Sequence, residues 1–162
     1  MKKHFLFIFL AAAAAFALTA CESKSQSTPY AALHKLMIRT SSEGHTDTLQ
    51  YLDTVQIADT IRQSFYIDGG FNVLTYFEAS ADASALNISL EVDSAVKTLL
   101  TTGTDLEHGK MVFDPQKYVI AVTGKLKMVP LKSGKLPFVI TVANDAGKDY
   151  SPRSLEYALI VK

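Results

Sequence analysis

The stretch that decides the fold is LNISLEV, Leu86–Val92. Apolar residues stand at every second position in it, and polar residues stand between them. Successive side chains of a β-strand point to opposite faces, so this spacing predicts a strand with one buried face and one wet face. An amphipathic helix would instead need apolar residues three and four positions apart.

The same period of two recurs along the chain, with turn residues between the segments. Together these segments predict an all-β fold, an antiparallel β-sandwich of about seven to nine strands. Only Ala95–Leu100 has the pattern of a short helix. Besides Leu86–Val92, the expected strands are Leu33–Arg39, Thr54–Ile57, Ile61–Ile67, Phe71–Phe77, Ile120–Met128, Phe138–Val142 and Leu155–Val161.

Two glycines, Gly69 and Gly70, stand between two of these strands. Glycine tolerates the positive φ that tight turns require, so the pair predicts a β-hairpin. In such a hairpin Tyr66 and Tyr76 lie on the wet faces. Their rings either stabilise each other across the strands or form a platform for a ligand.

The C-terminal segment, PLKSGKLPFVITVANDAGKDYSPRSLEYALIVK at 130–162, combines a strand of alternating aliphatic residues, an Asn-Asp-Ala-Gly turn and a final aliphatic strand. It resembles the last strands of bacterial immunoglobulin-like domains. The resemblance implies that the sandwich is immunoglobulin-like. A fold of this kind hosts many activities and does not specify one.

The N-terminus has the features of a secretory signal. Lys2 and Lys3 precede an apolar run, Phe5–Ala17, that is too short to cross a bilayer of about 30 Å as a helix. The run leads to Leu-Thr-Ala-Cys, Leu18–Cys21, which holds the single cysteine of the chain. This motif resembles the lipobox of bacterial lipoproteins. The resemblance implies cleavage before Cys21 and acylation of its sulfur, which ties the protein to a lipid bilayer.

These features divide the chain into three parts. Residues 1–20 are the expected signal peptide, residues 21–30 the lipidated cysteine with a flexible Ser-rich tether, and residues 31–162 the sandwich. With the lipobox, the chain looks like the small envelope lipoproteins of gut-type Gram-negative bacteria. Glu22 stands where an inner-membrane retention signal would carry Asp, so we expect the outer membrane; the leaflet stays open.

The charge distribution argues against nucleic acid as a partner. The chain has 16 basic and 16 acidic residues, and removal of Lys2 and Lys3 with the signal would leave it slightly acidic. Acids dominate from Ser41 to Asp114, and lysines dominate after it. The late lysines indicate a hairpin whose exposed edges are guarded by charge, with a patch for anionic lipid or polysaccharide as the alternative.

The sequence contains no recognisable enzyme motif. There is no Gly-x-Ser-x-Gly elbow, and His34, His45 and His108 lack metal-ligand spacing. The loop Thr101–Lys110 has two acids and a histidine, which are too few for a calcium cage and favour a mobile surface loop. We therefore expect no metal, no cofactor and no enzymatic activity.

A short pattern, Asp-(Ser/Thr)-aliphatic, occurs four times. It is similar to the sequon at which some Gram-negative bacteria attach O-glycans to exported proteins, and this resemblance implies O-glycosylation of at least one site. The alternative is a turn that leads into a strand, because Asp and Thr favour such positions. The candidate acceptors are Thr48, Thr54, Thr60 and Ser94.

The expected function is that of a membrane-anchored, non-catalytic sandwich that binds a glycan or protein partner, or has a structural role, at the cell envelope. One alternative is a fimbrial or adhesin-type subunit that polymerises by strand exchange. Another is a hydrolase that uses surface carboxylates, which would need a pocket with converging acids of perturbed pKa.

Replacement of Cys21 by alanine tests the anchor. We expect the Cys21→Ala variant to leave the membrane fraction, because the acyl chains that hold such a protein to the bilayer are attached at this one residue. Membrane fractionation, with mass spectrometry of the N-terminal peptide, measures this. A wild-type protein with a free thiol or an intact leader would contradict the expectation.

Overall fold

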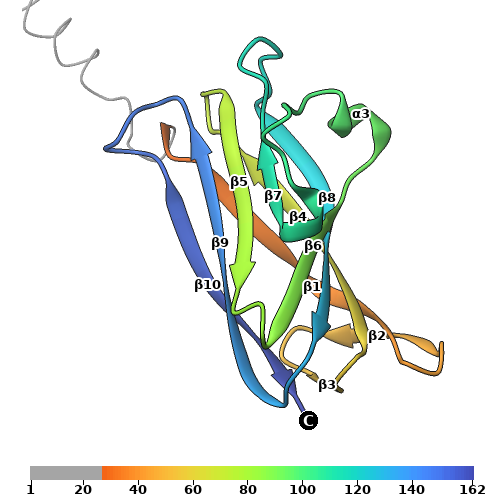
Figure 1. The fold of residues 1–162 in the computed structure, drawn as a ribbon. Coiled ribbons are helices and arrows are strands. Elements are labelled where there is room, and N and C mark those ends of the chain that lie inside the picture. The colour runs from red at the N-terminus through yellow and green to blue at the C-terminus, as the bar shows by residue number, and fades with distance from the viewer. Residues whose placement is uncertain (1–26) are drawn as a thin grey trace, which may run out of the picture.

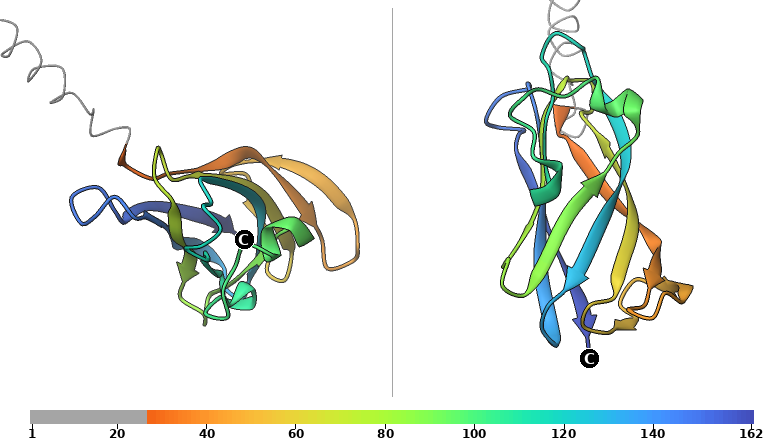
Figure 2. Two further views of the ribbon diagram at one scale, coloured as in Figure 1. Left: turned by 90° about the horizontal axis from the view of Figure 1, so that it is seen from above. Right: turned by 45° about the vertical axis from the view of Figure 1, so that its right-hand side comes forward.

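The computed structural model describes residues 27–162, so Cys21 and the expected signal peptide lie outside the described residues. Two five-stranded sheets pack face to face (Figure 1). This arrangement confirms the expected all-β, immunoglobulin-like sandwich. The described residues form ten strands, where seven to nine were expected, and one strand pair is parallel. The start of β1 and the C-terminus lie at opposite ends of it (Figure 2, right).

Sheet 1 has the strand order β2-β1-β4-β8-β6 and sheet 2 the order β3-β10-β9-β5-β7. The strands of sheet 1 are β1 (Tyr30–Thr40), β2 (Thr46–Gln50), β4 (Thr60–Asp68), β6 (Leu86–Glu91) and β8 (Ala121–Pro130). Those of sheet 2 are β3 (Thr54–Val55), β5 (Leu74–Ala81), β7 (Lys110–Val112), β9 (Gly134–Asn144) and β10 (Arg153–Val161). The helical segments are α3 (Ser94–Lys97) and the 3₁₀ turn η1 (Leu106–His108).

The alternation that predicted a strand at Leu86–Val92 is confirmed in β6. Leu86, Ile88 and Leu90 are buried, whereas Asn87 is exposed. The short helix expected near Ala95 is also confirmed, as α3. Among the described residues, no helix has the length and apolar character needed to cross a membrane.

The prediction of a hairpin at Gly69-Gly70 is wrong. Strand β4, before the glycines, belongs to sheet 1, and β5, after them, belongs to sheet 2. Each strand has one apolar face, and the arch between them turns these faces toward each other across the core. Phe71, expected in the second strand, lies in the arch and is 76% exposed. Hydrogen bonding alone would permit a hairpin, but burial of both faces favours the arch.

The two tyrosines expected on this hairpin therefore do not pair. Tyr66 lies in β4 and Tyr76 in β5, on different sheets. Each hydroxyl donates instead to the carboxylate two residues further along its own strand, Asp68 and Glu78 respectively. Burial, and then the hydrogen bond to Glu78, raises the pKa of Tyr76.

The expectation of a lysine-guarded hairpin in the late basic segment holds only in part. Strands β9 and β10 form an antiparallel hairpin, with Lys148 in its loop and Arg153 on β10. The turn at 131–133 connects β8 of sheet 1 to β9 of sheet 2. Lys125 and Lys127 lie on β8, which has β4 and β6 on its two sides, so these two lysines do not guard an edge.

The centre of the core is a pair of stacked rings. Phe65 of sheet 1 and Phe77 of sheet 2 have ring centroids 4.8 Å apart and an interplanar angle of 19°. Phe65 lies opposite Gly124 on β8. A Cβ atom on this glycine would lie 2.5 Å from Cζ of Phe65 and 2.9 Å from Cγ1 of Val92. The missing side chain therefore makes the space that the ring occupies.

Three short strands are poorly marked in the sequence. Strand β2 is mostly exposed and polar, and β7 is only three residues long. Strand β3, expected at Thr54–Ile57, is limited to Thr54–Val55 and runs parallel to β10. Short edge strands with little buried surface leave a weak periodic signal.

Replacement of Gly124 by alanine tests the space beside Phe65. We expect the Gly124→Ala variant to lose about 1–3 kcal/mol of unfolding free energy, because the methyl group overpacks the ring. Urea denaturation followed by circular dichroism measures the change.

Gly103→Ala is the matched control. A Cβ atom there would meet nothing closer than 3.6 Å, so the variant is expected to be near-neutral. In a Phe65→Leu background, Gly124→Ala should cost less than in the wild type. Equal costs in the two backgrounds would contradict the proposed overlap with the ring.

Candidate functional site

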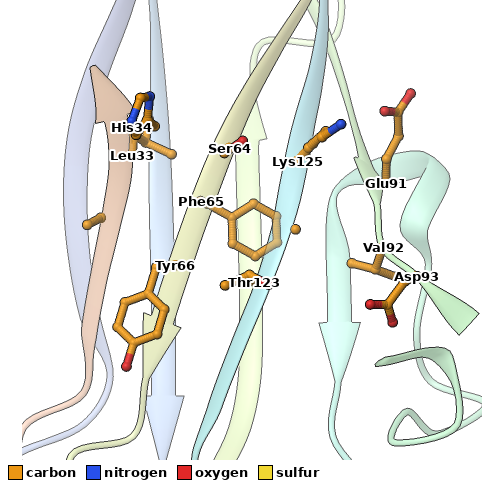
Figure 3. A pocket seen from close by; sticks show the side chains of 12 residues that line it. Leu33, His34, Ser64, Phe65, Tyr66, Glu91, Val92, Asp93, Thr123 and Lys125 are labelled. Atoms are coloured by element: carbon orange, nitrogen blue, oxygen red, sulfur yellow. The ribbon is translucent and has the colours of Figure 1, made fainter. Parts of the chain in front are cut away.

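A groove of about 670 Å³ crosses the N-terminal half of β1, together with β4 and β8, on sheet 1 (Figure 3). Leu33 and His34 lie on one side of it, and Glu91, Val92 and Asp93 lie on the other. Its lining residues are Ala32, Leu33, His34, Ser64, Phe65, Tyr66, Glu91, Val92, Asp93, Thr123, Gly124 and Lys125.

Small side chains in matching registers explain the hollow. Ala32 of β1 lies beside Tyr66 of β4, which lies beside Thr123 of β8. In the next row, Ser64 lies beside Lys125. Alanine, serine and threonine project little above the sheet, whereas the tyrosine and lysine beside them are long. The groove is therefore a low region between taller side chains.

The ring of Tyr66 is fixed at its polar end. Its hydroxyl donates to Oδ2 of Asp68 at 2.5 Å, and the residue is 40% exposed. This hydrogen bond, with smaller contributions from burial and from the carboxylate charge, raises the pKa of Tyr66. The group thus stays neutral and presents an aromatic surface to the groove.

His34 presents a hydrogen-bond donor. Its Nδ1 accepts from the backbone N–H of Leu36 at 3.1 Å, which places the proton of the neutral ring on Nε2. The pairing of β1 with β4 shifts between Leu33 and Met37, so this part of β1 bulges. Nε2 of Gln63, a buried residue, donates to the carbonyl of His34 at 2.7 Å and supports the bulge.

The charged groups of the groove differ in how they are engaged. Both oxygens of Glu91 accept from Nε of Arg62, at 3.0 and 3.1 Å. Oδ1 of Asp93 accepts from the backbone N–H of Val96 at 2.8 Å and caps α3. Within residues 27–162, Lys125 forms no ion pair. Its ammonium group is therefore available to a ligand.

The four candidate glycan acceptors do not come together in one site. Thr48 in β2 and Ser94 in α3 are exposed, whereas Thr54 in β3 and Thr60 in β4 are half-buried. Their preceding aspartates are engaged locally. Asp47 forms an ion pair with Arg39, and the other three cap turns or α3.

Two of the four sites belong to a repeated turn. In the first copy, Gln50 N–H donates to Oδ2 of Asp53 at 2.8 Å, and Asp53 N–H donates back to the carbonyl of Gln50 at 3.0 Å. Leu52 between them has a φ of 79°. The second copy makes the same contacts with Gln56, Ala58 and Asp59. Asp53 and Asp59 therefore form turns that lead into β3 and β4, as the alternative interpretation of the Asp-(Ser/Thr)-aliphatic pattern predicted.

The loop Thr101–Lys110 is closed by its own contacts. Oδ2 of Asp105 lies 2.8 Å from Nδ1 of His108, and Oδ1 accepts from the His108 N–H at 3.2 Å. The hydrogen bond to the His108 side chain is the main cause that lowers the pKa of Asp105. In the described part of the chain, no group of three or more His, Cys, Asp or Glu side chains could hold a metal ion.

Among the groove residues, sequence reasoning named Tyr66 as part of a ligand platform and His34 as a histidine without metal-ligand spacing. The others are common surface types, and only the register between β1, β4 and β8 brings them together. The signal that was available is the Phe65–Gly124 pair, since an aromatic residue and a glycine often face each other on adjacent strands.

Comparisons with known proteins leave the function open. No family model and no curated protein matches this chain. Among solved structures, it is similar to the collagen-binding domain from a Staphylococcus aureus adhesin, with 12% identity and a TM-score of 0.34 over 62% of this chain and 87% of that domain. A likeness this distant assigns no ligand.

If the chain carries O-glycans, exposure predicts which sites bear them. We expect modification of Thr48 or Ser94 and little at the half-buried Thr54 and Thr60, because a transferase must reach the hydroxyl in the folded protein. Intact mass and peptide mapping of native protein measure this. The absence of any hexose mass would end the glycosylation hypothesis, and modification confined to Thr54 would contradict the order.

Proposed function

We propose that this protein is a non-catalytic binding domain held at the cell envelope by a lipid on Cys21, with the groove on sheet 1 as its ligand site. The observation that carries the proposal is the groove itself, with a fixed aromatic ring, apolar surface and free hydrogen-bonding groups. Ligand sites combine concave, mainly apolar lining with a few placed polar groups in this way.

The chemistry of the groove favours a ligand with one apolar face and polar edges. Tyr66, Leu33 and Val92 offer the apolar contacts. The Nε2–H of His34 and the ammonium of Lys125 offer donors. Sugar rings of a glycan and extended peptides both present this combination, in agreement with the glycan or protein partner expected from the sequence.

The hydrolase alternative gains no support from the acids. Glu91 and Asp93, the two carboxylates of the groove, are already engaged by Arg62 and the start of α3. Asp82 and Asp105 have lowered pKa values, chiefly through hydrogen bonds to Ser84 and His108. A general acid needs a raised pKa.

An anchor at Cys21 would place the groove close to the bilayer. Five residues separate Cys21 from Ser27, so the two lie within about 20 Å of each other. The carbonyl of Ser27 accepts from Nδ2 of Asn144 at 2.8 Å, which ties the chain to the sandwich at that point. The groove includes residues 32–34, a few residues further along. The ligand would thus bind near the membrane-proximal end.

Binding to arrays of oligosaccharides and extended peptides tests the function. We expect Tyr66→Ala to weaken binding at least about tenfold, because a fixed aromatic ring is a typical anchor of a binding site. Ser64→Trp, which fills the hollow, should abolish binding. Affinities are measured by calorimetry with the best ligand from the arrays.

Phe71→Ala is the matched control, since this exposed aromatic residue lies outside the groove lining. It should bind like the wild type. A ligand that binds Ser64→Trp with unchanged affinity would place the binding site elsewhere and overturn the proposal.

A further inference from the structure

Strand β10 has an open edge over most of its length. One side pairs with β9 from Arg153 to Val161, whereas the other pairs with β3 only at Ile160 and Val161. In Figure 1, β10 runs down the left side of the molecule, and β3 lies near its lower, C-terminal end. Within residues 27–162, the stretch Arg153–Leu159 has no strand partner on that side.

Two hydrogen bonds show which residues point toward the open side. Ala158 N–H donates to the hydroxyl of Tyr51 at 3.4 Å, and Lys162 N–H donates to the carbonyl of Val55 in β3 at 2.9 Å. Backbone groups alternate along a strand, so the N–H and C=O of Ser154 and Glu156 also point outward. Within residues 27–162, no neighbouring strand makes hydrogen bonds with these backbone groups.

Apolar surface accompanies the open edge. Leu155 lies opposite the buried Ile140 of β9, yet it is 39% exposed. Tyr157, two residues on, is half-buried against Phe138, with ring centroids 5.5 Å apart. Sheet 1 does not fully cover this part of β10, so a further strand beside it would bury apolar side chains as well as fill hydrogen bonds.

We propose that β10 pairs with β10 of a second copy of this chain, antiparallel and about a two-fold axis at Leu155. The two copies of sheet 2 then become one continuous sheet. The contact is self-complementary, as a two-fold interface must be.

Backbone parity and local chemistry select this register. The even-numbered residues of β10 point their backbone groups outward, so an even-numbered residue of one copy must face an even-numbered residue of the other. This is possible only when the two-fold axis passes through a residue, and not when it passes between two residues. An axis at Glu156 would put like charges opposite each other, which destabilises a strand pair. An axis at Ser154 would place Pro152 opposite Glu156, and proline has no N–H to donate. An axis at Tyr157 would use Ala158, whose N–H is taken by Tyr51.

The register centred on Leu155 has favourable pairs throughout. Ser154 faces Glu156 of the second copy, and both exchange backbone hydrogen bonds. On the other face, Leu155 packs on Leu155 of the second copy, and Arg153 lies beside Tyr157 of the second copy, whose ring contacts Phe138 and Tyr51 of its own chain. Pro152 at one end and the Tyr51 hydroxyl at the other limit the pairing to five residues of each chain.

Sedimentation of the full chain in mild detergent, over a range of concentrations, tests the proposal. We expect a monomer–dimer equilibrium whose dissociation constant rises at least about tenfold in Leu155→Lys. Leu131→Lys is the matched control, because Leu131 is 42% exposed and lies in the turn before β9, at the opposite end of β10 from Arg153–Tyr157. It should dimerise like the wild type.

Cross-linking tests the register. In a Cys21→Ala background, Leu155→Cys should form an intermolecular disulfide readily, because facing residues at such a position have Cα atoms about 4.5 Å apart. Arg153→Cys should not, since the two copies would lie four residues apart along the strands, or about 14 Å.

Three results would overturn the proposal. They are a wild-type chain that stays monomeric at every concentration, a dimer that Leu155→Lys leaves unchanged, and equal cross-linking of the two cysteine variants. A monomeric wild type that binds an extended peptide at β10 would assign the edge to a different protein and not to a second copy.

Discussion

The stacking of Phe65 on Phe77 is the contact on which the rest of the sandwich depends. It joins the two sheets at their centre, and it requires the empty position at Gly124 on the neighbouring strand. Phe65 faces Gly124 in the pairing of β4 with β8, so the fit of the ring over this glycine favours one register of the two strands. That register in turn sets which small side chains lie side by side on sheet 1. The core and the groove are therefore two results of one constraint.

Much of the fold could be predicted from the sequence, because burial on one face leaves a period of two. Strands such as β6 and β9 follow that pattern closely. The connections could not be predicted in the same way. Gly69-Gly70 suits a hairpin and an arch equally well as backbone, and only the mutual burial of Phe65 and Phe77 distinguishes them. Alternation specifies which face is buried, but it does not specify the sheet to which a strand belongs.

Little of the candidate site could be predicted. Ala32, Ser64 and Thr123 are ordinary surface residues until the register aligns them. The open edge of β10 is equally hidden, because a strand with one partner and a strand with two have the same periodicity. The anchor at Cys21 is the opposite case, since a contiguous motif carries it and the described residues do not include it.

The repeated turn between β2 and β4 has a consequence for how this chain can change. The chain passes from sheet 1 to β3 in sheet 2 and back, and the inward residues Leu49, Val55 and Ile61 stand six positions apart. Each turn carries the chain to the facing sheet, so the aliphatic residue after it again points into the core. Because one turn changes the sheet, the gain or loss of both turns together would return the chain to sheet 1 with its aliphatic residues directed inward. This corner is therefore where descendants of the protein could vary in length at the lowest cost to the core.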